Sequence, residues 1–141
     1  MSKCEDAFRK FLFDIVPRGL RKFLDHSAVD VIMFRMATEG ARELIDVECE
    51  EPGCVIKNTL ETLKSLGLIR EYEVKDGRAV IRLGDSRRCV IAFILGAVSG
   101  TMEKKFGKVN IFTPIGKYVS KDAKVTLKAE VLWDGIEIKW F

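Results

Sequence analysis

The chain has 141 residues, of which 48% are apolar and 32% are charged, and its 24 basic residues exceed its 21 acidic residues by only three. This length suits one domain with a core of its own, and the composition is too apolar for an intrinsically disordered chain. So small a charge excess does not by itself indicate nucleic-acid binding, which would need a localised basic patch.

The first part of the chain has the apolar periodicity of helices. Apolar residues at helical spacing over Glu5–Val16 predict a first helix. The Pro-Arg-Gly sequence at 17–19 is expected to end it, because proline lacks the N–H that a helix interior needs. A second helix is expected to begin at a cap on Asp25 or Ser27 and to run to about Ile45. Gly40, inside the second helix, costs about 1 kcal/mol relative to alanine and therefore suggests close packing at that point.

A third helix is expected after an acidic loop. The loop Asp46–Gly53 carries four acids and ends in Pro-Gly. Apolar residues at helical spacing then predict a helix over Val55–Leu66, and Gly67 suits the left-handed conformation that ends many helices.

A β-hairpin is predicted next. Leu68–Lys75 alternates apolar and polar side chains, and Arg78–Leu83 is a second extended segment. The Asp76-Gly77 pair between them is a strong hairpin signal, because these two residue types tolerate the positive φ angles of a tight turn.

A long apolar helix is predicted at the centre of the domain. It should be capped by Asp85-Ser86 and end at Gly107, and between Cys89 and Val98 it is apolar on all sides. A helix of this kind must be covered over most of its surface. Gly96 and Gly100 belong to a stripe of small residues that a backbone, a sheet or a ligand can approach closely.

The chain then returns to strands. The expected segments are a strand at Lys108–Phe112, a turn region at Thr113–Asp122, a strand at Ala123–Trp133, a hairpin turn at Asp134-Gly135 and a strand at Ile136–Phe141. Helices and antiparallel strands are segregated along the chain, which is typical of the α+β class. We predict a single domain over residues 1–141, with N-terminal helices in 1–54, an antiparallel sheet and one long buried helix.

The four cysteines are too few for a disulfide framework in a domain of this size. Cys49 and Cys54 are five residues apart among acids, a spacing at the edge of that used by structural zinc sites, so whether they bind a metal stays open and no metal site is assigned. The chain begins with charged residues, and its longest apolar run is far below the ~20 residues that cross a bilayer. We expect a cytoplasmic protein with reduced thiols and no membrane span.

No arrangement of residues typical of catalysis is apparent. The single histidine, His26, lies in an expected turn between helices, where a capping or surface role is more typical than a catalytic one. The sequence contains no nucleotide-binding or metalloprotease motif. It therefore favours a non-enzymatic function without a cofactor.

One alternative is DNA binding. Residues 55–83 resemble the recognition helix and wing of winged-helix regulators, with Lys57, Lys64, Lys75 and Arg78 as the DNA contacts. However, the preceding loop is eight residues long and acidic, whereas the joint of a helix-turn-helix is a turn of three or four residues. The carboxylates of this loop would also repel phosphates, so the sequence argues against nucleic acid as a partner.

The apolar surplus on the central helix favours a pocket for an apolar ligand beside it. The candidate lining residues are Cys89, Phe93, Gly96, Gly100 and Phe112. Arg87 and Arg88 occupy the first turn of the helix, where its dipole disfavours cations, so they are candidates for an anionic head group. Whether Cys89 is reactive or only a small buried residue stays open. A second alternative is a ligand-free assembly subunit, in which this helix is only core.

Motifs around the central helix appear in a fixed order. They are a strand at Val80–Leu83, an acidic-Ser turn at Asp85-Ser86, Cys89 opening an apolar helix, Gly96 and Gly100 four apart, Gly107, and a strand at Val109–Phe112. This order resembles the 4-vinyl reductase (4VR) domain family, predicted hydrocarbon-binding domains similar in fold to the small palmitoyl-binding subunits of the TRAPP vesicle-tethering complex. The likeness spans residues 55–131. Unlike many members, the chain has no cysteine between Phe112 and Val125, and its last hairpin strand, 132–141, is unmatched.

The resemblance implies a small-molecule-binding or assembly domain that is typically a homodimer. Its ligand would be a hydrocarbon or acyl-type molecule beside the central helix, held in a sensing or carrier role. The reductase chemistry in the family name is not carried over, because the chain has no nucleotide fingerprint and because a shared fold does not establish chemistry.

Overall fold

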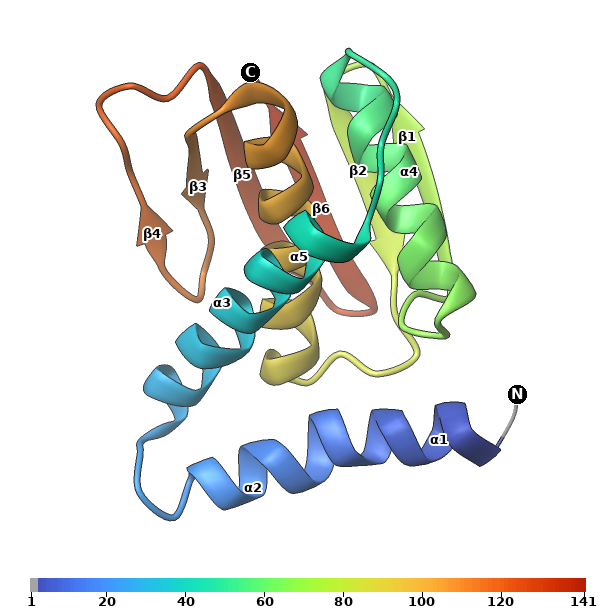
Figure 1. The fold of residues 1–141 in the computed structure, drawn as a ribbon, viewed down its shortest axis with the longest axis vertical. Coiled ribbons are helices and arrows are strands. Elements are labelled where there is room, and N and C mark those ends of the chain that lie inside the picture. The colour runs from blue at the N-terminus through green and yellow to red at the C-terminus, as the bar shows by residue number, and fades with distance from the viewer. Residues whose placement is uncertain (1–2) are drawn as a thin grey trace.

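A six-stranded sheet, in the order β1-β2-β6-β5-β3-β4, carries the main helices on one face in the computed structural model (Figure 1). The structure describes residues 3–141, with side chains from residue 6 onward. The elements are α1 (Lys3–Lys10), η1 (Phe11–Ile15), α2 (Val16–Leu20), α3 (His26–Leu44), α4 (Pro52–Ser65), β1 (Glu71–Lys75), β2 (Arg78–Arg82), α5 (Arg88–Phe106), β3 (Val109–Phe112), β4 (Lys117–Tyr118), β5 (Val125–Leu132) and β6 (Gly135–Trp140). The predicted α+β class is confirmed.

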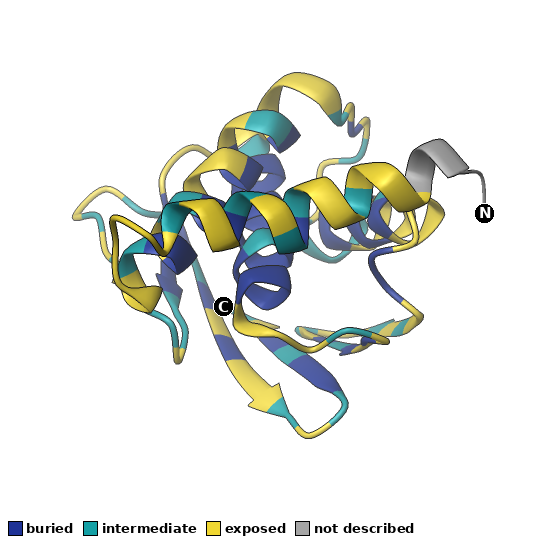
Figure 2. Ribbon diagram, turned by 90° about the horizontal axis from the view of Figure 1, so that it is seen from below, coloured by how far each residue is buried: buried dark blue, intermediate teal, exposed yellow. Residues whose placement is uncertain are grey.

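The first three helical pieces form one continuous rod, which lies across the amino ends of α3 and α5 (Figures 1 and 2). We call residues 3–24, which are this rod and the turn after it, the N-terminal arm. The prediction that the helix ends at the Pro-Arg-Gly sequence is wrong, because the helix continues to Leu20. The turn before Pro17 is π-helical, with the Val16 N–H donating to the Phe11 carbonyl, and Pro17 then occupies the first turn of α2, where a missing N–H is tolerated.

Helix α3 crosses α5 at the predicted stripe of small residues. An added Cβ would overlap the Phe34 carbonyl oxygen at Gly96 and the Thr38 carbonyl oxygen at Gly100. The Thr38 hydroxyl donates to the carbonyls of Phe34, at 2.9 Å, and Gly96, at 3.1 Å. The backbone of α3 thus covers the stripe. The close packing predicted at Gly40 is wrong, since an added Cβ there would meet no atom within 4 Å.

The central position of α5 is confirmed. Every residue from Cys89 to Met102 except Phe93 is buried. Helix α3 crosses one side of it, and α4 lies beside it, where the buried hydroxyls of Thr59 and Thr101 are 2.6 Å apart. The sheet closes the remaining side, and in Figure 2 α5 is mostly dark blue whereas the arm and the strands carry exposed residues as well.

The sheet is mostly antiparallel, with the last strand at its centre. β6 pairs with β2 on one side and β5 on the other, both antiparallel. The β3–β5 pair is parallel, because the chain passes through β4 and a loop before it returns as β5. Strand β4 lies inside the region predicted as a turn.

Cys49 and Cys54 form a disulfide, with their Cα atoms 6.0 Å apart. The expectation of reduced thiols is therefore wrong for this pair. Helix α4 begins at Pro52, three residues before the predicted start. Cys54 therefore lies in the first turn of the helix, within bonding distance of Cys49 in the loop before it. Residues 6–141 contain no group of three or more potential metal ligands. Within residues 3–141, no helix combines the length and the apolar character that crossing a bilayer requires.

Candidate functional site

The candidate site lies at the amino end of α5, beneath the N-terminal arm. Pro17 has no N–H to donate to the carbonyl of Phe13, four residues earlier. Two groups of the site serve this oxygen instead, the Arg87 guanidinium at 3.3 Å and the Cys89 thiol at 3.7 Å. Because Pro17 cannot donate to it, the Phe13 carbonyl is free to accept the hydrogen bonds that attach the arm to the amino end of α5.

Arg87 links three segments of the chain. Its guanidinium donates to Asp85 at 3.0 and 2.6 Å and also pairs with Asp14 of the arm. These hydrogen bonds hold the pKa of the Asp85 carboxyl below its usual range and raise the pKa of Arg87 above its own. Arg87 is thus a permanent cation that fixes the turn before α5 to the arm.

Arg88 pairs with a buried acid on α3. Its Nε lies 2.8 Å from an Asp30 carboxylate oxygen. The Asp30 residue is only 4% exposed, whereas the Arg88 side chain is 59% exposed. The positive end of the helix dipole repels a cation in the first turn, and the Asp30 carboxylate offsets this electrostatic cost for Arg88.

Cys89 is buried between these groups. Burial raises the pKa of its thiol, while the positive charge of Arg87 opposes the shift. The thiol is therefore protonated at neutral pH, and it lacks the thiolate character of a reactive cysteine.

A pocket of about 260 Å³ opens beside these residues. It is lined by Arg21 from the arm, His26, Val29 and Asp30 from α3, and Arg87, Arg88 and Cys89 from the turn and α5. A second pocket, of about 330 Å³, shares Arg87 with the first and is also lined by Arg9 and Lys10 of the arm. Three residues of the predicted site therefore meet at one pocket, together with four that sequence reasoning did not assign to it.

The other predicted site residues lie elsewhere. Phe93 packs edge-on against Phe13, with ring centroids 5.4 Å apart. The sequence interpretation placed a ligand against Gly96 and Gly100, but the backbone of α3 occupies that position. Phe112 is half-buried on β3 and lines none of the pockets described here. The space open to a ligand is therefore at the end of α5 and not along its glycine stripe.

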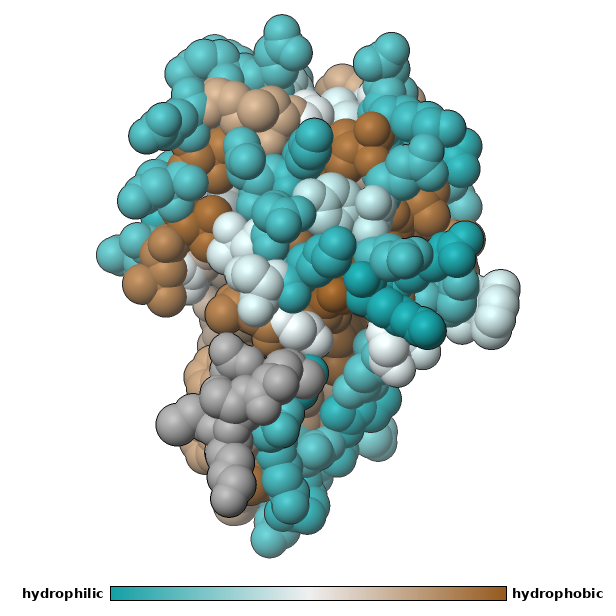
Figure 3. Space-filling model, turned by 90° about the vertical axis from the view of Figure 1, so that its right-hand side faces the viewer, coloured by the Kyte–Doolittle hydropathy of each residue, from teal (hydrophilic) through white to brown (hydrophobic). Residues whose placement is uncertain are grey.

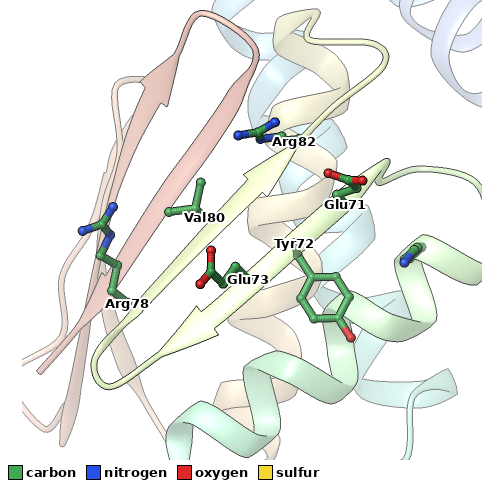
Figure 4. A pocket seen from close by; sticks show the side chains of 7 residues that line it. Glu71, Tyr72, Glu73, Arg78, Val80 and Arg82 are labelled. Carbon is green, nitrogen blue, oxygen red and sulfur yellow. The ribbon is translucent and has the colours of Figure 1, made fainter.

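The hairpin surface proposed for DNA binding carries both signs of charge. A pocket of about 690 Å³ there is lined by Lys64, Arg78, Arg82, Glu71, Glu73, Tyr72 and Val80 (Figure 4). Arg78 pairs with Glu137 at 2.9 Å, and Lys75 pairs with Glu73 at 3.1 Å. Glu61 accepts a hydrogen bond from the Tyr72 hydroxyl and, with burial, raises the pKa of Tyr72 to about 12.

The β1–β2 hairpin does not project from the domain as the wing of a winged-helix protein would. Strand β2 of the hairpin pairs with β6 along its whole length, so the hairpin is part of the main sheet. Figure 3 shows this side of the molecule as mainly hydrophilic, with small hydrophobic patches between the polar groups. The surface has no concentrated positive charge to favour a phosphate backbone.

Comparison of the chain with known protein families, with curated proteins and with solved structures finds no match. The resemblance of residues 55–131 to the 4VR domain family therefore stays a prediction from the sequence motifs.

Proposed function

We propose that the protein is a non-enzymatic small-molecule-binding domain, which holds the polar end of an apolar, acyl-type ligand at the amino end of α5. The observation that carries this proposal is the pocket where Arg87, Arg88 and Cys89 meet Arg21 and His26. Its lining combines three exposed arginines with buried Val29 and Cys89, and the one acid in it, Asp30, is paired with Arg88. This combination suits an anionic head group on an apolar molecule.

Arg21 is the cation best placed to bind an anionic head group. Arg87 and Arg88 are already paired with carboxylates, whereas the Arg21 side chain forms no ion pair within residues 6–141. The apolar part of the ligand would enter beneath the arm and replace the Phe13–Phe93 contact. Burial of each CH₂ contributes about 0.8 kcal/mol before ordering costs. The role would be carriage or sensing of the ligand.

The test compares Arg21→Ala with Lys22→Ala, which removes the neighbouring exposed cation that does not line the pocket. Binding of a fluorescent long-chain carboxylic acid is measured in buffer without lipid vesicles. Arg21→Ala is expected to raise the Kd about fivefold, as for the loss of one exposed charge pair, and Lys22→Ala is expected to leave it unchanged. Failure of the parent protein to bind the acid, or equal losses in both variants, would refute the proposal.

A homodimer is the second candidate, either as the ligand-binding form or as a ligand-free assembly. The observation that favours it is a group of apolar side chains on the outer face of α3, in which Val31 and Met36 are exposed and Ile32 is half-buried. A second copy could cover this group across a two-fold axis.

Light scattering after size exclusion is expected to give twice the chain mass of 16.0 kDa for the parent protein. Met36→Glu should give the monomer mass, because it would place charges in the shared apolar group. Leu44→Glu is the matched control at the exposed end of α3 and should stay dimeric. A monomeric parent, or two variants that behave alike, would exclude this face as the dimer contact.

We propose the cytoplasm, as the sequence predicts, although the Cys49–Cys54 disulfide of the structure is of a kind that cytosolic glutathione reduces. In cells the two cysteines should therefore be thiols, and a disulfide that persists there would place the protein in an oxidising compartment instead.

A further inference from the structure

The outward side of the N-terminal arm is apolar. Phe8, Phe11 and Ile15 are 58%, 55% and 41% exposed, and their spacing places them on one face of the rod. Phe13, on the opposite face, is 4% exposed and holds the arm to the domain. In Figure 2 the arm lies nearest the viewer, and much of the side that faces the viewer is exposed.

The apolar surface continues past the end of the rod. Phe23 is 87% exposed in the turn before α3, and Leu24 beside it is also exposed. Five large apolar side chains on one short segment exceed the scattered exposure that is ordinary for a soluble surface. A feature of this size indicates an interaction surface.

The arm also holds a charge excess equal to that of the whole chain. Residues 6–24 contain five cations and two acids, and the chain as a whole has a net charge of +3. Both acids are engaged, Asp6 with Arg9 at 2.6 Å and Asp14 with Arg87. The remaining cations are exposed and form no ion pair within residues 6–141; they are Lys10, Arg18, Arg21 and Lys22. The arm therefore presents apolar side chains and unpaired cations together.

We infer that the arm docks on a membrane surface that contains anionic lipids. Phenylalanine and isoleucine side chains on a helix can enter the boundary between head groups and acyl chains, and the flanking lysines and arginines then meet lipid phosphates and carboxylates. A second copy of the chain is a poorer occupant, because a two-fold contact through this face would bring four unpaired cations of each copy together. An anionic lipid surface suits both the apolar and the charged groups.

Arg21 also lines the ligand pocket, so the membrane test uses Phe8, Phe11, Arg18 and Lys22, which do not. The test is co-sedimentation with vesicles of phosphatidylcholine alone and of phosphatidylcholine mixed with phosphatidylserine. The parent protein should bind the mixed vesicles, bind pure phosphatidylcholine weakly, and be released by added salt, because salt screens the lipid charge.

Two variants separate the apolar and the charged contributions. Phe8→Ser with Phe11→Ser should weaken binding to mixed vesicles about tenfold or more, because two large apolar groups no longer enter the lipid. Trp133→Ser, at an exposed tryptophan in the β5–β6 turn, is its matched control and should bind as the parent does. Arg18→Ala with Lys22→Ala should reduce the preference for phosphatidylserine, whereas Lys121→Ala with Lys128→Ala, which removes two exposed lysines outside the arm, should not.

All of these positions are exposed, so the variants should keep the circular dichroism and thermal midpoint of the parent protein. Absence of binding to the mixed vesicles would overturn the inference, as would equal losses in the arm variants and their controls. If the phenylalanine variant changed the solution mass without changing vesicle binding, a second copy would be the occupant of this face.

Discussion

Replacing Gly96 with alanine is expected to destabilise the fold by about 3 kcal/mol, because the two helices at its core have no room for a methyl group there. The added Cβ would overlap the carbonyl oxygen of Phe34 and lie 3.0 Å from the Cβ of Ala37. The first of these neighbours is backbone and cannot move aside alone, so α3 as a whole would have to shift. Urea denaturation followed by circular dichroism would measure the loss.

Gly40→Ala is the matched control for this prediction. It makes the same substitution in a helix of the same crossing pair, but an added Cβ meets nothing within 4 Å. Alanine is favoured over glycine inside a helix, so Gly40→Ala should stabilise the protein by up to about 1 kcal/mol. Equal stability of the Gly96→Ala protein and the parent would show that α3 does not cross α5 at this residue.

Arg88→Met is expected to cost about 2 kcal/mol, because it leaves the buried carboxylate of Asp30 without its cation. The cost of removing one partner from a fully buried pair is about 3–5 kcal/mol, and we reduce it because water reaches the exposed Arg88 side chain. Methionine keeps most of the length of the arginine stem, so packing changes little. The free energy of unfolding at neutral pH would measure the effect.

A double-mutant cycle isolates the charge from the packing. Asp30→Asn removes the buried charge, so Arg88→Met should be nearly neutral in that background. The two single changes should therefore not add. Additive losses would mean that Arg88 acts through its stem and not through Asp30.

Local signals were enough to predict most of the elements. The apolar run after Asp85-Ser86 predicted a covered central helix, and Asp76-Gly77 predicted the hairpin turn, where Gly77 has φ +72°. Each of these depends on residues close in the sequence. The resemblance to a known family covered the same segments and added no element beyond them.

Features that depend on distant partners were not predicted. Pro17 is a helix breaker by local rules, but a π-helical turn places it in the first turn of α2, where the helix continues. Arg87 and Cys89, 74 and 76 residues from Phe13, donate to the Phe13 carbonyl that proline leaves free. The parallel pairing of β3 with β5 depends likewise on the path through β4, which has only two residues and little sequence signal.

In the candidate site, too, sequence reasoning found the residues that are neighbours in the chain and missed those that only the fold brings together. Arg87, Arg88 and Cys89 are consecutive, so their proximity required no knowledge of the fold. Arg21 and His26 reach the pocket because the arm turns back before α3 and α3 packs on α5, which no local pattern indicates. The glycine stripe predicted a close approach, but residue types alone cannot say whether a ligand or another helix makes it.

The position of β6 has a consequence for how the chain reaches this structure. The β1–β2 hairpin and strand β5 share no backbone pairing, and only β6 joins them. The ribosome adds residues 135–140 after all the other strands, so during synthesis both β2 and β5 present bare edges next to apolar inner faces. Such edges invite pairing with other chains. We expect the nascent protein to depend on chaperones until this strand emerges, and to aggregate when synthesis stops short of it.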